Sequence, residues 1–435
     1  MRHAIGFSDL AGRRVGVFGL GDEGRAARSR LEALGCDVVV VDDDPGSTGD
    51  PTVSATGAGG LELLATCTAV IKAPGISRYR KDVQSLERRG VAVLGGVGMW
   101  LEEADRARVI CVTGTKGKST VTTAIGHLAE RLGTPSVVTG NLGVPPFDPD
   151  LDTTGTLVVV ETSSFQATDV AHSPGVVVVT SLGDDHVDWH GSAEQYRADK
   201  LSLTSQPGAA STIAADTPTL RACSAMLGGE VTYVDAALGV ALAHRLGLAG
   251  THGASNAAVA AAALRAAKVP GSDDEALVEA AAAGYEPLPG RFRTIATRGG
   301  VRFIDDSLAT NPLPAIAAIE SVGDARLALL LGGHDRGVDY TGLVQAIAMR
   351  AAPTAVMTLP ESGPRIGTRI RAASDLVVID APDIGSAVRE ALHWLDGEGV
   401  VLLSPAAPSF TQFRNWKERS EAFAAAVDEL AGPSA

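Results

Sequence analysis

The sequence has few cysteines, few aromatic residues and no long apolar run, and its acidic residues outnumber its basic ones. Its four cysteines have no metal-like pairing and three of them fall in apolar surroundings, so we expect buried, reduced thiols. The opening residues 1–7 lack an apolar signal core and no run is long enough to span a bilayer, which favours the cytoplasm and excludes membrane partners. A net charge of -14 argues against nonspecific binding of nucleic acid. We therefore expect small-molecule partners and a monomer.

The overall composition is that of an ordinary globular protein, with 45% hydrophobic and 20% charged residues. A chain of 435 residues is too long for one core, and about 150 residues per domain indicates about three domains. Apolar strands alternate with helical patterns throughout, which predicts an α/β fold. We predict a Rossmann-like N-terminal domain at 1–106, a central P-loop ATPase-type domain with a mostly parallel sheet at 107–291, and a Rossmann-like C-terminal domain at 292–435.

A phosphate-binding loop is the most informative motif. The apolar stretch 109–112 is followed by Thr113-Gly-Thr-Lys-Gly-Lys-Ser-Thr120 and then by a helical pattern. Glycines let backbone N–H groups approach phosphate oxygens, Lys118 supplies a charge for the outer phosphates, and Ser119 supplies a hydroxyl ligand for Mg²⁺. The loop is contracted, because only two residues separate its two glycines, whereas the standard loop has four. The predicted ATP-binding residues of this loop are Gly114, Thr115, Lys116, Gly117, Lys118, Ser119 and Thr120.

The N-terminal section contains a GxGxxG pattern after the apolar stretch 15–18. This pattern can serve simple strand-to-helix packing, or it can place a nucleotide diphosphate at a helix N-terminus. Asp22 and Glu23 put negative charge where a pyrophosphate would lie, so binding there must use backbone N–H groups. The candidate ligand-binding residues are Gly19, Gly21 and Asp42.

In the middle section, two apolar stretches at 157–160 and 176–179 are each followed by an acidic, polar segment. Such segments meet at the carboxyl edge of a parallel sheet, beside the phosphate loop. Glu161 and His186 are candidate Mg²⁺-site ligands, although a single histidine is more often structural. Lys200 lies in a helical pattern and by itself would be interpreted as a solvated lysine.

The last section repeats the α/β rhythm, with strands expected at 301–304, 327–331, 355–359, 376–379 and 400–403. Polar loops separate these elements, which predicts a lid over the nucleotide. Arg336 is interpreted either as a surface charge or as a planar fork that holds a carboxylate through two hydrogen bonds.

Taken together, the motifs resemble the Mur ligases, which build the cytoplasmic peptidoglycan precursor, and in particular their glutamate-adding, MurD-type branch. The resemblance covers nearly the whole chain. The motifs that carry it are Gly19-Leu-Gly21, Ala73-Pro-Gly-Ile76, Gly114-Thr-Lys-Gly-Lys-Ser-Thr120, Gly140-Asn-Leu-Gly143, Glu161-Thr-Ser-Ser-Phe-Gln166, Asp185-His-Val-Asp188, Tyr196-Arg-Ala-Asp-Lys200, Asp306-Ser-Leu-Ala-Thr-Asn311 and Ser404-Pro-Ala-Ala-Pro-Ser409.

The resemblance implies that the first domain holds the UDP of UDP-N-acetylmuramoyl-L-alanine, the central domain holds ATP and Mg²⁺, and the third closes with the incoming glutamate. It implies an acyl-phosphate mechanism and carbamylation of Lys200, which would turn a cation into a metal-binding carboxylate. The implied roles are catalysis for Lys118, His186 and Lys200; metal binding for Ser119, Glu161, His186 and Lys200; ATP binding for Asn256, Arg291 and Asp306; UDP-substrate binding for Gly75 and Asn141; and glutamate binding for Thr310, Arg336, Ser409 and Trp416.

Five residues depart from the usual motifs of the family. Three of the five belong to the third section, on or near the amino-acid side, while the ATP and metal residues look intact. This distribution favours a rearranged glutamate pocket, and the phosphate loop resembles that of a subgroup that adds L-glutamate, so we predict L-glutamate over D-glutamate. The departures are Lys116 for asparagine, Gly253 for asparagine, Leu308 for lysine, Arg336 for lysine and Trp416 for phenylalanine.

Three rival interpretations remain open at this point. A folylpolyglutamate-type ligase also joins glutamate to a carboxylate, but that family begins directly with the ATP domain. An NAD-dependent oxidoreductase would explain only the GxGxxG pattern and Asp42. A catalytically silent regulatory homologue is suggested by Leu308 and by the acidic Asp22 and Glu23.

Overall fold

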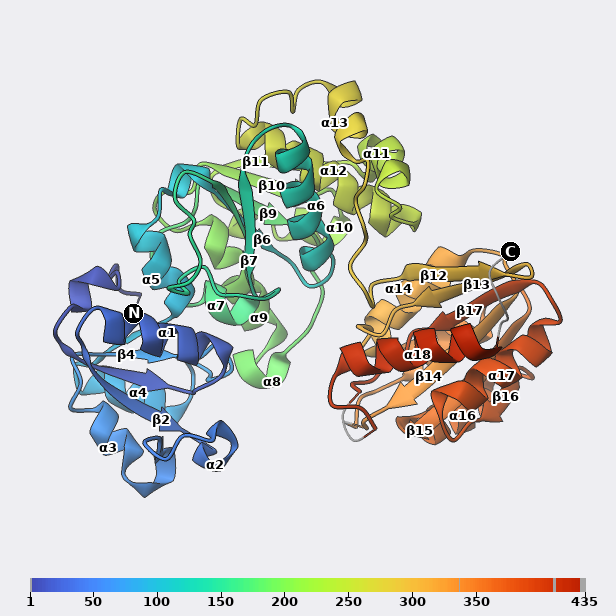
Figure 1. Cartoon of the computed structure of the whole chain (residues 1–435), viewed down its shortest axis with the longest axis horizontal. Helices are drawn as coiled ribbons and strands as arrows, with labels where there is room; N and C mark the ends of the chain where they lie inside the picture. Colours follow the sequence, from blue (N-terminus) through green and yellow to red (C-terminus); the bar gives the residue numbers. More distant parts are fainter. Residues whose placement is uncertain (1, 336, 410–411, 431–435) are drawn as a thin grey trace. The chain divides into compact units, whose positions relative to one another are not determined.

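The computed structural model describes residues 2–335, 337–409 and 412–430. The chain forms two compact units, of which the first contains Met1–Leu248 and Gly253–Tyr285 and the second contains Ala249–His252 and the chain from Glu286 onward. Three β-sheets organise them, two in the first unit and one in the second (Figure 1). No helix in the described part of the chain is long and apolar enough to cross a membrane.

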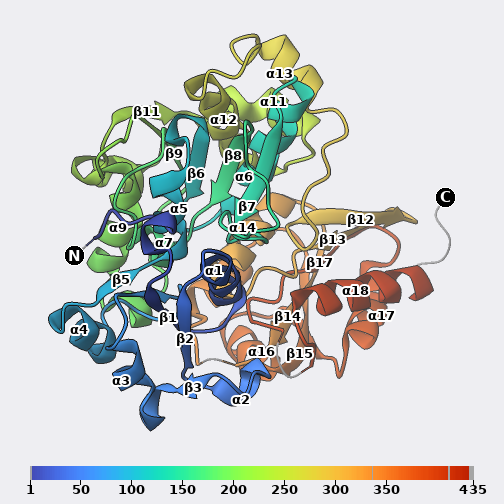
Figure 2. The same cartoon turned by 60° about the vertical axis from the view of Figure 1, so that its left-hand side comes forward.

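The first sheet is parallel and has the strand order β3-β2-β1-β4-β5, which is a Rossmann-like order. The order reverses between β1 and β4, so the loops after these two strands lie at the point where such sheets bind ligands. Helix α1 packs on β1 and β2 (Figure 2). The strands are β1 Arg14–Phe18, β2 Asp37–Asp42, β3 Ser54–Ala55, β4 Ala69–Lys72 and β5 Ala92–Leu94, and the helices are α1 Asp22–Ala33, α2 Pro45–Thr48, α3 Gly60–Leu64, α4 Lys81–Arg88 and α5 Gly96–Glu103.

The second sheet is also parallel, in the order β11-β10-β9-β6-β8-β7. Strands β6, β8 and β9 are completely buried, as expected for central strands covered on both faces. The strands are β6 Val109–Thr113, β7 Ser136–Gly140, β8 Leu157–Glu161, β9 Val176–Val179, β10 Ser211–Ala215 and β11 Glu230–Val234. The helices are α6 Lys118–Arg131, α7 Ser164–Ala167, α8 Val187–His190, α9 Ala193–Leu201, α10 Pro218–Ala222, α11 Val240–Arg245, α12 Gly250–Ala266 and α13 Glu275–Ala281.

The third sheet has the order β12-β13-β17-β14-β15-β16 and is parallel except for β12, which runs antiparallel to β13. Helices α17 and α18 pack together over one face (Figure 1), and α14, α15 and α16 contribute to the core on the other. The strands are β12 Arg293–Arg298, β13 Val301–Asp305, β14 Leu327–Gly333, β15 Thr354–Glu361, β16 Val377–Asp380 and β17 Gly399–Leu403, and the helices are α14 Pro312–Val322, α15 Thr341–Ala348, α16 Ser362–Ala373, α17 Ile384–Leu395 and α18 Trp416–Leu430.

The predicted α/β fold class is confirmed, and the five strands expected in the last section are present within one or two residues. Strand β12 is not among the expected strands, because its sequence is largely polar and it lies at a sheet edge. The proposed domain boundaries near 106 and 291 remain predictions. Each of the three predicted segments contains one sheet, while a single apolar core runs through the first two sheets.

A buried ion pair joins the first two sheets. Lys72, the last residue of β4, lies 2.6 Å from the Asp169 carboxylate, and both side chains are almost fully buried. Arg78 contacts the other oxygen of Asp169 at 3.0 Å. Two ionised side chains removed from water in this way depend on each other, since removing one leaves the other as an uncompensated buried charge.

We expect Asp169→Ala to lower the free energy of unfolding of the first unit by about 3–5 kcal/mol, because Lys72 would remain buried without its carboxylate. Urea denaturation of the full chain measures the change. Glu62→Ala is the control, because it breaks an exposed pair with Arg89 that solvent screens, so its effect should be much smaller. Equal effects of the two substitutions would contradict the prediction.

Candidate functional site

The phosphate-binding loop lies between β6 and α6, at the carboxyl end of the second sheet. Gly114 and Gly117 have φ angles of 143° and 85°, a backbone conformation that residues with a side chain rarely adopt. A Cβ atom at Gly114 would lie 2.1 Å from the Thr180 hydroxyl, and one at Gly117 would lie 2.5 Å from the Asn256 amide oxygen. Both glycines are therefore required by conformation and by space, and Asn256 lies against the loop, as its predicted role requires.

Hydrogen bonds to the segment after β9 fix the shape of the loop. The backbone N–H of Thr115 donates to the Ser181 carbonyl at 2.9 Å, and that of Lys116 donates to the Ser181 hydroxyl at 2.8 Å. The Thr115 hydroxyl contacts the Tyr196 hydroxyl at 2.9 Å and accepts from the backbone N–H of Gly183 at 2.9 Å. The loop is thus preorganised by the segment after β9 and by α9.

Two predicted catalytic lysines converge on one backbone oxygen. Lys118 Nζ donates to the Gly114 carbonyl at 3.0 Å and to that of Thr115 at 3.3 Å, and Lys200 Nζ donates to the same Gly114 carbonyl at 2.9 Å. Lys200 is 2% exposed, so the interpretation of it as a solvated helix lysine is wrong. Burial, reinforced by the charge of Lys118, lowers the pKa of Lys200 well below its ordinary value.

The carboxylate of Glu161 lies at the end of β8, next to the strand that leads into the loop. It is 2% exposed, and its Oε1 accepts from the side-chain amide of Asn141 at 2.9 Å. Within the described residues its Oε2 is buried without a hydrogen-bond partner. Because buried polar atoms normally have partners, this oxygen is suited to accept a cation.

His186 stands at the start of α8 with a φ angle of 49°. Its side chain is 51% exposed and its ring lies edge-on to Phe165. Burial lowers the pKa of His186 although Asp185 opposes the effect, which favours the neutral imidazole that can bind a metal. Burial would raise the pKa of Asp185, but Lys116, 3.4 Å away, and His186 hold it below its usual value.

The residues present fit a magnesium ion only in part. Across the described ranges, no three histidine, cysteine, aspartate or glutamate side chains come together as a metal site. Glu161 offers one oxygen and Ser119 is a buried hydroxyl at the first turn of α6, so further ligands must come from outside this set. Phosphate oxygens of a bound nucleotide are oxygen ligands of the kind that would complete it.

The loops at the switch point of the first sheet contain the predicted UDP-substrate residues. Gly19 has a φ angle of 93°, and Gly21 precedes the first turn of α1. Asp42 already accepts a hydrogen bond from the backbone N–H of Leu20 at 2.7 Å, so it fastens this loop whatever else it contacts. Gly75 lies exposed in the loop after β4, where its carbonyl accepts from the Trp189 indole at 3.2 Å.

Burial acts against the negative charge of Glu23, one of the two acidic residues in this glycine loop. Burial raises the pKa of Glu23 to about 7, even though its hydrogen bond with Gln166 acts in the opposite direction. The Gln166 amide also completes a capping box with Ser163 at the start of α7. Glu23 therefore faces the central sheet as a hydrogen-bond partner of the capping residue.

In the second unit, the predicted ATP-binding Asp306 is 7% exposed. It accepts hydrogen bonds from the Ser404 hydroxyl at 2.7 Å and the backbone N–H of Phe292 at 3.2 Å. Burial raises its pKa to about 7, while Ser404 and the half-buried Arg291 act against the increase. Asp306 and Arg291 are thus close neighbours.

Three of the predicted glutamate-binding residues lie on loops or helix starts of the second unit. Thr310 follows the Asp306 turn, Ser409 is 5% exposed, and Trp416 begins α18. A Cβ at Gly290 would lie 2.9 Å from the Trp416 ring and 3.6 Å from Leu308, so two of the departing residues flank one glycine. Arg336 lies outside the described residues.

Sequence reasoning missed a buried arginine that supports these loops. Arg419 is 1% exposed and donates to the Ala407 carbonyl at 3.0 Å and the Ser307 carbonyl at 2.7 Å. Burial lowers its pKa to about 10, against the charges of Asp305 and Asp306. Nothing in the charged start of α18 distinguishes Arg419 from its exposed neighbours, so no local signal could have found it.

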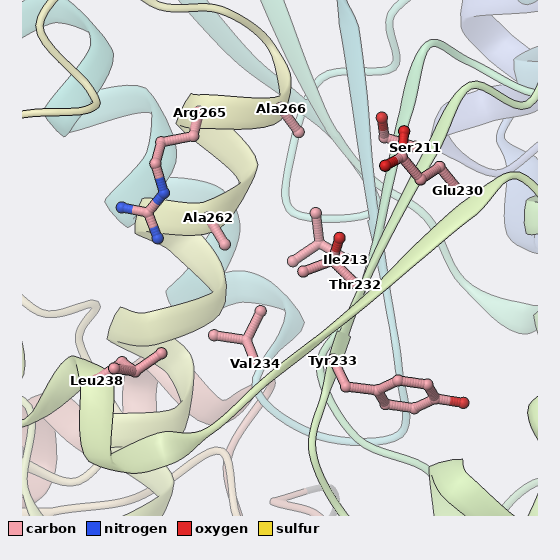
Figure 3. Close-up of a pocket in the computed structure, with 10 residues that line it drawn as sticks. All are labelled: Ser211, Ile213, Glu230, Thr232, Tyr233, Val234, Leu238, Ala262, Arg265 and Ala266. Atoms are coloured by element: carbon pink, nitrogen blue, oxygen red, sulfur yellow. The ribbon is translucent and has the colours of Figure 1, made fainter.

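A pocket of about 320 Å³ lies elsewhere in the first unit, between β10, β11 and α12 (Figure 3). Ile213, Val234 and Ala262 lie around the space in this view, while Tyr233 points away from the helix. None of the predicted site residues lines it. This pocket is therefore separate from the phosphate-loop site.

Comparisons with known proteins agree with this arrangement. Residues 112–237 match the model of the Mur ligase middle domain, and residues 290–407 match that of the Mur ligase, glutamate ligase domain. The UDP-N-acetylmuramoyl-L-alanine–L-glutamate ligase of Micromonospora sp. is 37% identical, with 98% of each chain covered. The protein of the same name from Xanthomonas euvesicatoria is 33% identical, with 98% of this chain and 96% of the relative covered.

Solved structures show the same fold at low identity. The UDP-N-acetylmuramate–alanine ligase MurC of Thermotoga maritima has a TM-score of 0.57 at 15% identity, with 96% of this chain and 99% of that chain covered. MurF from Acinetobacter baumannii has a TM-score of 0.57 at 16% identity, with 92% and 89% covered. The full-length sequence matches and the phosphate-loop site lead to one conclusion: this chain belongs to the Mur ligase family, whose members form amide bonds at the expense of ATP.

Proposed function

We propose that this chain joins glutamate, preferably L-glutamate, to the alanyl carboxylate of UDP-N-acetylmuramoyl-L-alanine in the cytoplasm, acting as a monomer. The observation that carries the proposal is the meeting of Lys118 and Lys200 at the Gly114 carbonyl. In this arrangement Lys118 supplies positive charge where phosphate groups of ATP would lie, and Lys200 lies beside it at the same backbone oxygen. Relatives that match over nearly their whole length are named for the same reaction.

In the proposed reaction, an oxygen of the alanyl carboxylate forms a bond to the γ-phosphorus of ATP as the bond to the ADP oxygen breaks. The glutamate amine then attacks the acyl carbon, phosphate leaves, and the amine nitrogen loses a proton. Lys118 offsets the negative charge that crowds the first step. A Mg²⁺ ion held by Glu161 and Ser119 would supply further neutralisation of negative charge when bound. The proposed reaction also requires that water be kept from the acyl phosphate.

Lys200 is proposed to act as a carbamate. Its neutral amine attacks CO₂, which forms an N–C bond and releases one proton, and the product is a carboxylate on a lysine stem. The reaction needs the uncharged amine, and the lowered pKa of Lys200 supplies it. Lys200 is buried beside the phosphate loop, so a carbamate there would add an oxygen ligand to the metal site. The carboxylates of the described residues do not complete that site by themselves.

The preference for L-glutamate rests on the second unit and on the names of the relatives. Inverting the α-carbon while keeping the amine aimed at the acyl carbon moves at least one carboxylate, so the pocket must be reshaped. Leu308 and Trp416 lie against Gly290 and replace a cationic and a smaller aromatic residue of the usual motifs. Arg336, as a planar fork, is the proposed carboxylate anchor.

The stereochemical proposal is tested by ligation assays with UDP-N-acetylmuramoyl-L-alanine, ATP and each glutamate enantiomer separately. We expect L-glutamate to be used and D-glutamate to be strongly discriminated against, since the wrong enantiomer leaves a charge unpaired. Arg336→Lys should raise the KM for glutamate more than the KM for ATP. Efficient use of D-glutamate alone would show an ordinary D-glutamate-adding ligase.

Lys118→Ala should reduce ligation on the order of a hundredfold or more, because it removes a preorganised charge from the phosphate site. Turnover is measured as phosphate release that depends on the UDP-linked substrate. Lys81→Ala, which removes an exposed lysine at the start of α4, is the matched control and should retain normal turnover. Near-normal turnover of a folded Lys118→Ala protein would contradict the proposed role.

Lys200→Ala should be almost inactive, and added acetate should restore part of the activity by occupying the position of the carbamate. The same acetate concentration should not help Lys118→Ala, which lacks a cation instead. Activity is again followed by phosphate release, and circular dichroism checks the fold. Full activity of Lys200→Ala, or identical acetate responses of the two variants, would refute the carbamate role.

A further inference from the structure

A buried hydrogen-bonded chain lies directly behind the three candidate metal-ligand segments of the first unit. His190 Nδ1 lies 2.6 Å from the Asp199 carboxylate, and its Nε2 lies 2.9 Å from the Ser164 hydroxyl. The three side chains are 2%, 5% and 2% exposed. Because Asp199 can only accept when ionised, the network assigns the proton to Nδ1 and leaves Nε2 to accept from Ser164.

A serine, a histidine and an aspartate hydrogen-bonded in this order also form the catalytic triad of many hydrolases. The hydrogen-bonded residues here are not placed to act as such a triad. A nucleophilic serine must reach a substrate carbonyl beside an oxyanion hole. Ser164 is instead the buried first residue of α7, and its hydroxyl is directed at His190. These hydrogen bonds therefore have a structural role, which is to hold neighbouring helices together.

Each member of this hydrogen-bonded network lies within four residues of a predicted metal ligand. Ser164 comes three residues after Glu161, and His190 comes four residues after His186. Asp199 immediately precedes Lys200 on α9. The imidazole of His190 thus links α7, α8 and α9, the elements that fix the positions of these ligands.

The hydrogen-bonded network continues through Tyr79 into the loop between β4 and α4. Its hydroxyl donates to the Asp199 carboxylate, with distances of 2.8 and 2.9 Å to the two oxygens. Trp189 on α8 donates to the Pro74 and Gly75 carbonyls at 3.2 Å, and its own carbonyl accepts from Ser77 at 2.8 Å. The loop 73–79, which contains the predicted UDP-substrate residue Gly75, is therefore fastened to α8 and α9.

Helix α8 has little stability of its own. It is four residues long and lies between His186 at a φ angle of 49° and Gly191 at 88°. A helix this short depends on tertiary contacts. A ligand that orders the loop 73–79 would therefore also order α8, and a second ligand at the metal site would meet a segment already in place.

We propose that the chain Tyr79–Asp199–His190–Ser164 couples the loop 73–79 to the phosphate-loop site, so that the UDP-linked substrate and Mg-ATP each raise the affinity for the other. The proposal rests on the proposed function for the identity of the two ligands. His190 and Asp199 act in it as positioning residues through Glu161, His186 and Lys200. By linkage, the factor must be the same in both directions.

Tyr79→Phe tests the coupling, because it removes only the hydroxyl of a side chain that is 37% exposed. Isothermal titration measures the affinity for a nonhydrolysable ATP analogue with Mg²⁺, with and without UDP-N-acetylmuramoyl-L-alanine. We expect an increase of about fivefold or more in the unaltered protein and of less than about twofold in Tyr79→Phe. Tyr233→Phe, the same change on β11 of the same unit, is the control and should retain the full coupling.

Hydrogen exchange gives a second readout that does not depend on turnover. The UDP-linked substrate alone should slow amide exchange in 184–191 of the unaltered protein and leave it unchanged in Tyr79→Phe. Equal coupling in the two proteins, or no coupling in the unaltered protein, would overturn the proposal. Failure of the unaltered protein to bind the UDP-linked substrate at all would instead refute the proposed function.

Discussion

The carbonyl oxygen of Gly114 accepts hydrogen bonds from two lysine side chains, and the arrangement of the site depends on this convergence. Two ammonium groups at one oxygen repel each other, and burial makes the charged form of Lys200 costly. Three responses reduce this cost: anionic phosphates bind, the Lys200 amine gives up its proton, or it becomes a carbamate. All three agree with a site built for ATP and a metal ion.

The position of this site follows from the strand order of the second sheet. Thr113 ends β6, Glu161 ends β8 and Val179 ends β9, and these three strands are neighbours in a parallel sheet. Their carboxyl ends lie at one edge of the sheet. The phosphate loop, the Glu161 carboxylate and the Ser181 segment therefore come together as a direct result of the strand order. Hydrogen bonds from the loop to Ser181 then fix its shape before any ligand arrives.

Motif spacing predicted the parts of the site that depend on local sequence. The glycines and Lys118 could be recognised because a phosphate loop imposes residue types at fixed positions on a strand, a turn and a helix. The burial of Lys200 could not be read from its helical pattern, and only the family resemblance indicated that this lysine has a role at the site. His190, Asp199 and Arg419 depend on contacts between segments far apart in sequence, and no periodicity records such contacts. The polar edge strand β12 was missed as a strand because its pairing partner, not its composition, defines it.

Two buried carboxylates at the predicted nucleotide-binding loops have a raised pKa for the same reason, which is burial. Glu23 lies in the glycine loop of the first sheet, and Asp306 follows β13 in the second unit. An ionised carboxylate in either place would repel a phosphate group, yet burial raises the pKa of each to about 7. Each can therefore hold a proton near neutral pH at modest cost, and an approaching anion favours that protonated form further. Glu23, which argued against nucleotide binding in the sequence, is thus compatible with it once its burial is known.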